Sequence, residues 1–269
     1  MKKFLLALAI AVFITPVFAE GIAVQTRVAR GDYASAEDAL RAARLKAETD
    51  VLDTLAAYLD VPSGDFTATS SVERFREAGG FLTARVSVET DLEAMWEKSE
   101  KTPPLPVFVV MDAYFEGKAD TREIGLSVFL QRLVRDLDIA RPELYLPAVK
   151  NVALDSERNR IIMETARKKG VYFVLFASLA VSSESVVTDN EKRSKAVLGC
   201  RLKSSVTGKT LWSTSPAVRA DYVLTEGNMF ERSAGNVCDI FYEQSIAAIK
   251  KAMTEAFLTE KYYETRSKK

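Results

Sequence analysis

The amino-acid sequence predicts an α+β protein of two domains, a small strand-helix-hairpin domain followed by a larger α/β sandwich with a mixed sheet and flanking helices. Strand-like apolar segments are interspersed with helix-period stripes along the whole chain. A proline-rich stretch at residues 102–106 separates the two halves. About 250 residues remain after an export signal, and at 48% hydrophobic composition they can bury two modest cores. We therefore expect domains at residues 20–101 and 107–269.

The first 19 residues have the features of a secretion signal. Two lysines precede an apolar run from Phe4 to Ile14, and small residues end the segment at Ala19. The run is shorter than the roughly 20 residues that a bilayer span needs. We expect cleavage between Ala19 and Glu20, export to the periplasm, and no stable membrane insertion. No cysteine near the cleavage point could accept a lipid.

The charge balance argues against a polyanion as the general partner. The full chain has 37 basic and 37 acidic residues, and removal of the signal takes away two lysines and no acid. The mature net charge of minus two gives no overall attraction to nucleic acid or to an anionic membrane.

The small domain begins with a weakly alternating strand at residues 21–30. Ser35 and Asp38 then have the spacing of a helix amino-terminal cap. Apolar residues follow at helical spacing: Leu40, Ala43, Ala47, Val51, Leu55 and Leu59. The spacing predicts a helix that ends before Pro62 and Gly64, with its alanines close to a sheet.

Two strands and a short helix complete this domain. Residues 65–75 and 81–91 are predicted strands joined across Gly79 and Gly80. The second alternates apolar and polar residues, which is typical of a sheet with one exposed face. A short helix from Leu92 to about Lys101 leads to the linker, where three prolines favour an extended connection.

The larger domain combines buried strands with helices. The continuously apolar runs at 107–111 and 171–180 suit central strands covered on both faces. Helices are predicted over 126–137 and 156–169. Three antiparallel strands follow at 195–206, 209–214 and 217–224, with a turn at Thr207-Gly208. A long helix at 230–262, with a frayed lysine-rich tail, ends the fold.

The two cysteines are candidates for a disulfide. Cys200 lies on a predicted strand and Cys238 on a predicted helix, each on an apolar face. An oxidising compartment favours a bond between them, and closing that loop would stabilise the fold by about 4 kcal/mol. Two buried free thiols are the alternative.

The sequence contains no histidine. This excludes Ser-His-Asp and Cys-His nucleophiles and histidine-ligated zinc. We expect no catalytic residue, no metal and no cofactor. The remaining enzymatic alternative is a carboxylate-dependent wall hydrolase, which would need a deep cleft lined by two close acids, one with a raised pKa.

Two segments carry a resemblance to a known family. The run from Gly31 to Ala43, a helix start after a strand, resembles the amino-terminal domain of the flagellar assembly protein T family. The second half resembles that family's middle domain and the amino-terminal domain of TolB, with Gly170 to Leu179 as a strand and a hairpin at Thr207 to Trp212. The resemblance implies a periplasmic structural protein of the flagellar basal-body ring, without catalytic residues.

These observations lead to a functional hypothesis. We expect a non-enzymatic periplasmic protein that binds envelope or flagellar ring proteins during assembly, with oligomer formation left open. The alternatives are a soluble accessory of outer-membrane or peptidoglycan assembly, and the wall hydrolase described above.

Overall fold

The computed structural model describes residues 21–115, 118–119, 123–145, 155–185, 192–214, 218–224 and 229–267. The predicted signal segment and its cleavage point at Ala19 and Glu20 lie outside these ranges. The described chain forms two compact units. The smaller unit ends at Pro104 and is completed by Lys250–Lys269, and the larger spans Leu105–Ile249. The predicted α+β fold with two sheets is confirmed.

The smaller unit is a three-stranded antiparallel sheet with one long helix. In chain order its elements are β1 (Ile22–Ala29), η1 (Arg30–Asp32), α1 (Ala36–Leu59), η2 (Ser63–Asp65), β2 (Ala68–Ala78), β3 (Phe81–Thr90) and α2 (Leu92–Lys98). The strand order is β1-β3-β2. Gly79 and Gly80, with φ of 57° and 77°, form the tight turn between β2 and β3, because only glycine adopts such angles readily.

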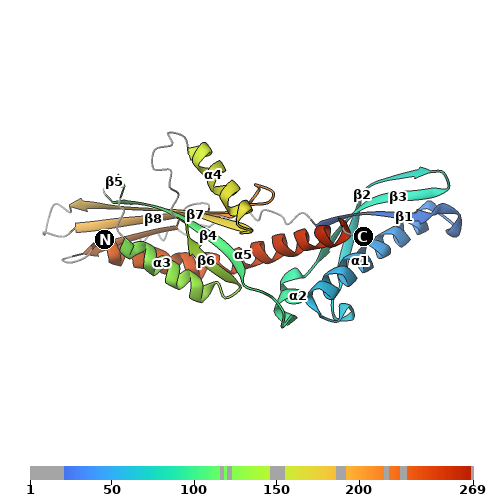
Figure 1. The fold of residues 1–269 in the computed structure, drawn as a ribbon, viewed down its shortest axis with the longest axis horizontal. Helices are drawn as coiled ribbons and strands as arrows, with labels where there is room; N and C mark the ends of the chain where they lie inside the picture. Colours follow the sequence, from blue (N-terminus) through green and yellow to red (C-terminus); the bar gives the residue numbers. More distant parts are fainter. Residues whose placement is uncertain are drawn as a thin grey trace, which may run out of the picture. The chain divides into compact units, whose positions relative to one another are not determined.

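Helix α1 lies across one face of this sheet (Figure 1). Its predicted stripe is confirmed from Ala43 to Leu59, while Ala39 rather than Leu40 is buried in the first turn. On the sheet, alternate residues of β1 and β3 are buried beneath the helix: Ile22, Val24, Thr26 and Val28, and Leu82, Ala84, Val86 and Val88. The residues between them lie on the opposite, open face.

The larger unit is built on a seven-stranded mixed sheet. Its elements are β4 (Leu105–Phe115), β5 (Lys118–Ala119), α3 (Glu123–Asp136), β6 (Ala140–Leu144), α4 (Asp155–Lys168), β7 (Phe173–Ser185), β8 (Lys192–Ser204), β9 (Thr210–Ser213), β10 (Val218–Leu224) and the first part of α5 (Met229–Ser267). The order is β10-β8-β7-β4-β5, with β6 paired to β4 and β9 to β8. Strands β4 and β7 are parallel neighbours.

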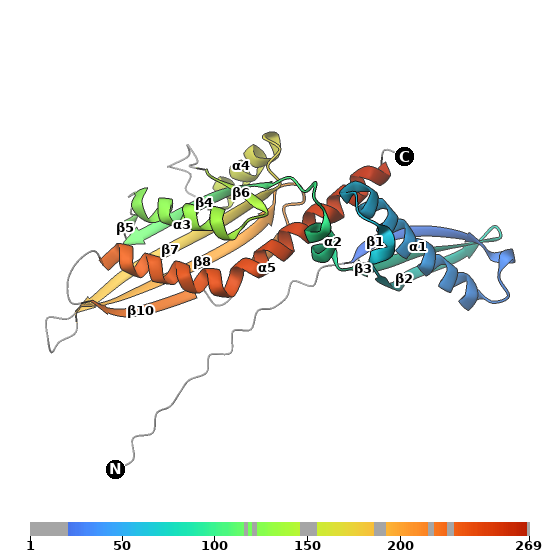
Figure 2. The ribbon, with the colours of Figure 1, turned by 90° about the horizontal axis from the view of Figure 1, so that it is seen from below.

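Helices cover both faces of β4 and β7, as their continuous apolar runs predicted. Figures 1 and 2 show α4 on one face, and α3 with the first part of α5 on the other. On the α4 side a buried cluster joins strand and helix: Phe108, Val110, Ile162, Ala166, Val171 and Val174. On the other side Phe129 of α3 contacts Phe241 of α5, with ring centroids 5.9 Å apart.

Two boundaries between the domains differ from the sequence prediction. Leu105 and Pro106 were expected in the linker, but they belong to β4 because they pair with Ala140 and Arg141 of β6. The last helix was expected to lie wholly in the larger domain, 107–269. The structure instead places Lys250–Lys269 in the smaller unit, and the helix continues to Ser267 where fraying was expected.

Candidate interaction surface

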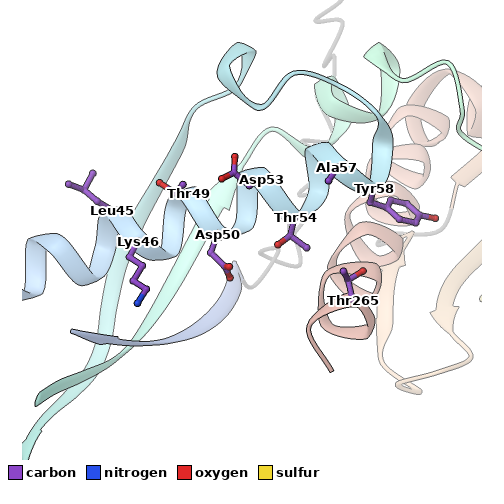
Figure 3. A pocket seen from close by; sticks show the side chains of 9 residues that line it. All are labelled: Leu45, Lys46, Thr49, Asp50, Asp53, Thr54, Ala57, Tyr58 and Thr265. Carbon is purple, nitrogen blue, oxygen red and sulfur yellow. The ribbon is translucent and has the colours of Figure 1, made fainter. Parts of the chain in front are cut away.

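A shallow groove of about 670 Å³ runs along the exposed side of α1 in the smaller unit. Figure 3 shows its side chains projecting from successive turns of α1, with one from α5 nearby. The lining residues are Leu45, Lys46, Thr49, Asp50, Asp53, Thr54, Ala57, Tyr58 and Thr265. The groove is therefore mostly one face of a helix, of the kind that another helix or an extended segment could cover.

The exposed apolar side chains of the groove follow from how α1 is built. The buried stripe uses one side of the helix, so residues at positions outside it are left in solvent. Leu45 is 57% exposed and Tyr58 is 39% exposed. Between them, the small side chains of Thr49 and Ala57 leave space along the helix surface. The groove thus presents two apolar groups near its ends and a low floor.

Carboxylates dominate the electrostatics of the groove. Asp53 is exposed. Asp50 accepts a hydrogen bond from Tyr262 Oη at 2.7 Å and lies 3.0 Å from the Arg266 guanidinium. The ammonium group of Lys46, the lysine of the groove, donates a hydrogen bond to the Arg27 carbonyl oxygen at 3.2 Å. A cationic partner group would therefore find Asp53 as the accessible counter-charge.

The contact with Asp50 also affects the pKa of Tyr262. Burial raises the pKa of Tyr262, and the hydrogen bond to Asp50 raises it further. The phenol therefore stays protonated at neutral pH and keeps donating to Asp50. This bond ties the last turns of α5 to α1 and forms one wall of the groove.

The structure does not form the predicted disulfide. Cys200 of β8 and Cys238 of α5 are both buried and both free. Burial raises the pKa of Cys200 well above its usual range, with a further contribution from Cys238, and it raises the pKa of Cys238 to about 12. Of the two settings weighed from the sequence, the structure has the buried free thiols. Such protonated thiols are poor nucleophiles.

A second, smaller pocket lies between α3 and α5 in the larger unit. It has a volume of about 430 Å³ and is lined by Arg132, Asp136, Asp239, Tyr242, Glu243 and Ile246. Arg132 forms an ion pair with Asp239 and lies over the Tyr242 ring. Tyr242 Oη donates to the Phe129 carbonyl at 2.7 Å. These polar groups contact one another, so they join two helices rather than point at a ligand.

Among the residues that the structure describes, two carboxyls have raised pKa values, Glu255 and Glu260 on α5. Burial is the main cause for both. Neither lines either of the two pockets described above. Within the described ranges, no three acids or cysteines lie close enough together to hold a metal ion. None of the helices in the described part of the chain has the length and apolar character to cross a membrane.

No protein-family model and no curated protein matches this chain. The resemblance to the flagellar assembly protein T family therefore stays a prediction. Several solved structures are similar to this chain. Lipoprotein GNA1162 from Neisseria meningitidis is 17% identical over 52% of this chain and 97% of its own, with a TM-score of 0.32.

Two others have comparable similarity. A PelC dodecamer from Paraburkholderia phytofirmans is 19% identical over 53% of this chain and 92% of its own, with a TM-score of 0.32. The LpoB carboxyl-terminal domain from Salmonella enterica is 16% identical over 50% of this chain and 93% of its own, with a TM-score of 0.26. At these identities and TM-scores the similarities carry no functional assignment.

The groove on α1 is the feature that sequence reasoning missed. Its signal was present, because Leu45 and Tyr58 are large apolar residues outside the buried stripe of a strongly patterned helix. Single exposed apolar residues are common on protein surfaces, however, and only the structure places these two along one groove.

Proposed function

We propose that this chain is an exported, non-enzymatic protein that binds other proteins in the periplasm during assembly of an envelope structure, with the α1 groove as a contact surface. The observation that carries the proposal is the groove itself, where exposed Leu45 and Tyr58 flank the accessible carboxylate of Asp53. Apolar anchors beside a charged group are typical of protein-binding surfaces. The signal segment supports the location.

The chemistry of the groove specifies the partner segment. It should bring an apolar side chain to Leu45 or Tyr58 and a lysine or arginine to Asp53. A helix fits best, because the lining residues follow helical spacing along α1 and two helices pack by placing the ridges of one in the grooves of the other.

The flagellar basal-body ring is the partner structure that the sequence resemblance supports. An accessory role in outer-membrane or peptidoglycan assembly is the second candidate. The identity of the bound protein separates the two, since nothing in the groove is specific to either.

In-cell photo-crosslinking tests the proposal. A photoreactive amino acid replaces Leu45 or Tyr58 in the full chain, and crosslinked bands are identified by mass spectrometry. The matched control carries the same amino acid at Lys168, an exposed helical position in α4. Bands specific to the groove positions, and lost in Asp53→Lys, are expected. Flagellar ring proteins in them favour the motor role, and wall synthases favour the accessory role.

Two outcomes contradict the proposal. Bands that are equal at the groove and at Lys168 would show that the groove has no partner. Release of soluble glycan from purified cell wall by the mature protein would replace the binding role with the hydrolase alternative.

A further inference from the structure

The open face of the small sheet carries arginines in register. Residues that pair across antiparallel strands project to the same face, and on the side away from α1 they form two rows. One row is Gln25, Arg85 and Arg74, and the next is Arg27, Thr83 and Arg76. All four arginines are exposed.

A β-bulge creates this arrangement. The register of β2 against β3 shifts between Val72 and Arg74, where Val72 faces Val86 and Arg74 faces Arg85. In a regular ladder Glu73 would face Arg85, and Arg74 and Arg76 would turn toward the helix side. The extra residue therefore directs both arginines onto the open face, which is a known use of bulges.

The paired arginines do not stabilise the fold. Arginines directly opposite each other on neighbouring strands repel. Glu73 compensates in part, with its carboxylate 2.6 Å from Arg85 Nε. Neither Arg74 nor Arg76 forms an ion pair with any residue that the structure describes. The other acid of this face is Glu89, so the face keeps a net positive charge.

An aromatic ring accompanies the arginines at the hairpin end. The Arg27 guanidinium lies 3.7 Å from the centre of the Phe81 ring, which is 37% exposed. Phe75 pairs with Ala84, whose side chain is buried beneath α1, so Phe75 projects to the other side of the sheet and is not part of this face. Figure 1 shows that the turn between β2 and β3 lies at the tip of the hairpin. Arginines beside exposed aromatics are typical of surfaces that enter the headgroup region of a membrane.

The face is flat and its cationic groups are spread out. Strand and residue spacings place the arginines over an area of about 10 Å by 7 Å. None of the four lines either described pocket. A single small anion would need converging donors, whereas separate guanidinium groups each match one phosphate of an extended layer.

We propose that the open face of β1, β2 and β3 binds anionic phospholipid headgroups, so that the small unit attaches peripherally to a membrane surface. Arg27, Arg74, Arg76 and Arg85 contact phosphates, and Phe81 enters the interface. This function is separate from protein binding at the α1 groove, and either can fail without the other.

Vesicle sedimentation of the full mature protein tests the inference. Vesicles of phosphatidylcholine alone are compared with vesicles that contain phosphatidylcholine and phosphatidylglycerol in equal amounts. Both are measured at low and at raised salt concentration. We expect binding to the anionic vesicles only, weakened by salt. Each Arg→Gln change on the face should lower the partition coefficient about fivefold, and Arg74→Gln with Arg76→Gln about 25-fold.

Matched controls are Arg41→Gln on α1 and Arg201→Gln on β8, which remove the same charge from exposed positions elsewhere. Thermal unfolding checks that the face variants fold, and removal of the Arg74 to Arg85 repulsion should leave their midpoints unchanged or raised. Three outcomes would each overturn the proposal. The control variants could lose as much vesicle binding as the face variants, or the protein could bind neutral vesicles as well as anionic ones. The third is binding to a soluble acidic glycan with no binding to anionic vesicles.

Discussion

Ser35 and Asp38 close the amino end of α1 with reciprocal hydrogen bonds. Ser35 Oγ accepts from the Asp38 amide at 3.1 Å, and Asp38 Oδ2 accepts from the Ser35 amide at 3.1 Å. Two amides that have no partner within the helix are satisfied in this way, and the carboxylate lies at the positive end of the helix dipole. The start of α1 is therefore determined by two side chains.

Ser35→Ala should lower the free energy of unfolding of the small unit by about 1 kcal/mol, because the Asp38 amide loses its acceptor. Urea unfolding followed by Trp96 fluorescence in a Trp212→Phe background reports this unit. Ser35→Thr keeps a hydroxyl acceptor and should lose only a few tenths of a kcal/mol. An alanine variant as stable as the parent would show that the cap contributes nothing.

The two buried thiols make stability depend on pH. Their pKa values are raised in the folded state, Cys238 to about 12, so folded thiols keep protons that the unfolded chain releases above about pH 8.5. Their stabilising effect is complete below that pH and is lost as pH rises. Each thiol should lower the free energy of unfolding by about 1.4 kcal/mol per pH unit in the alkaline range.

Unfolding measured between about pH 8 and pH 10, below the main tyrosine titration, checks this slope. The double variant Cys200→Ala with Cys238→Ala should have a flatter profile, whatever constant stability it loses through the cavities. An unchanged slope in that variant would assign the pH dependence to other groups. The parent protein, denatured without reduction, should contain two reactive thiols.

The last turns of α5 complete the small unit. Phe257 is buried and meets Trp96 of α2 edge-on, with ring centroids 5.6 Å apart at 90°. Tyr263 lies at the free edge of β1, where its hydroxyl accepts from the Ala23 amide at 3.0 Å. Occupied edge groups are less available for pairing with another chain. This segment therefore supplies both core and edge protection.

Phe257→Ala should destabilise the small unit by about 3 to 5 kcal/mol, the range for removing a buried aromatic side chain. Alanine is the best helix former, so the loss would report packing rather than helix propensity. Phe257→Leu keeps an apolar side chain and should lose less. Trp96 fluorescence during denaturant unfolding measures both, and equal, small losses would place Phe257 outside the core.

At the scale of the whole chain, one helix contributes to two compact units, its first part to the larger and Lys250–Lys269 to the smaller. Compact units open as cooperative pieces with their own free energies. The two parts of α5 should therefore differ in how they respond to a local destabilisation, although they share one continuous hydrogen-bonding pattern.

Hydrogen exchange tests this division. Ser35→Ala should speed amide exchange in β1, β3 and residues 253–262, by roughly fivefold for a loss of about 1 kcal/mol. Residues 237–246 and the strands β7 and β8 should exchange as in the parent. Equal acceleration along the whole of α5 would instead show that the helix opens as one piece.

Local patterns were enough to predict most of the fold. The period of the α1 stripe, the alternation of Leu82 to Val88 and the apolar runs of β4 and β7 each report burial by nearby spacing alone. The short strand β6 was missed, because Ala140–Leu144 contains a proline and two charged residues and has no apolar run.

Three features were decided only by tertiary structure. The amphipathic pattern of α5 continues through Ile249 and does not reveal which core each part covers, since both cores are apolar. The bulge at Val72 and Arg74 is defined by register against β3, and one extra residue reverses which side chains face outward. The sequence by itself determined the helices, the longer strands and the burial of the cysteines, whereas long-range packing decided that the thiols stay free and that the arginines gather on one face.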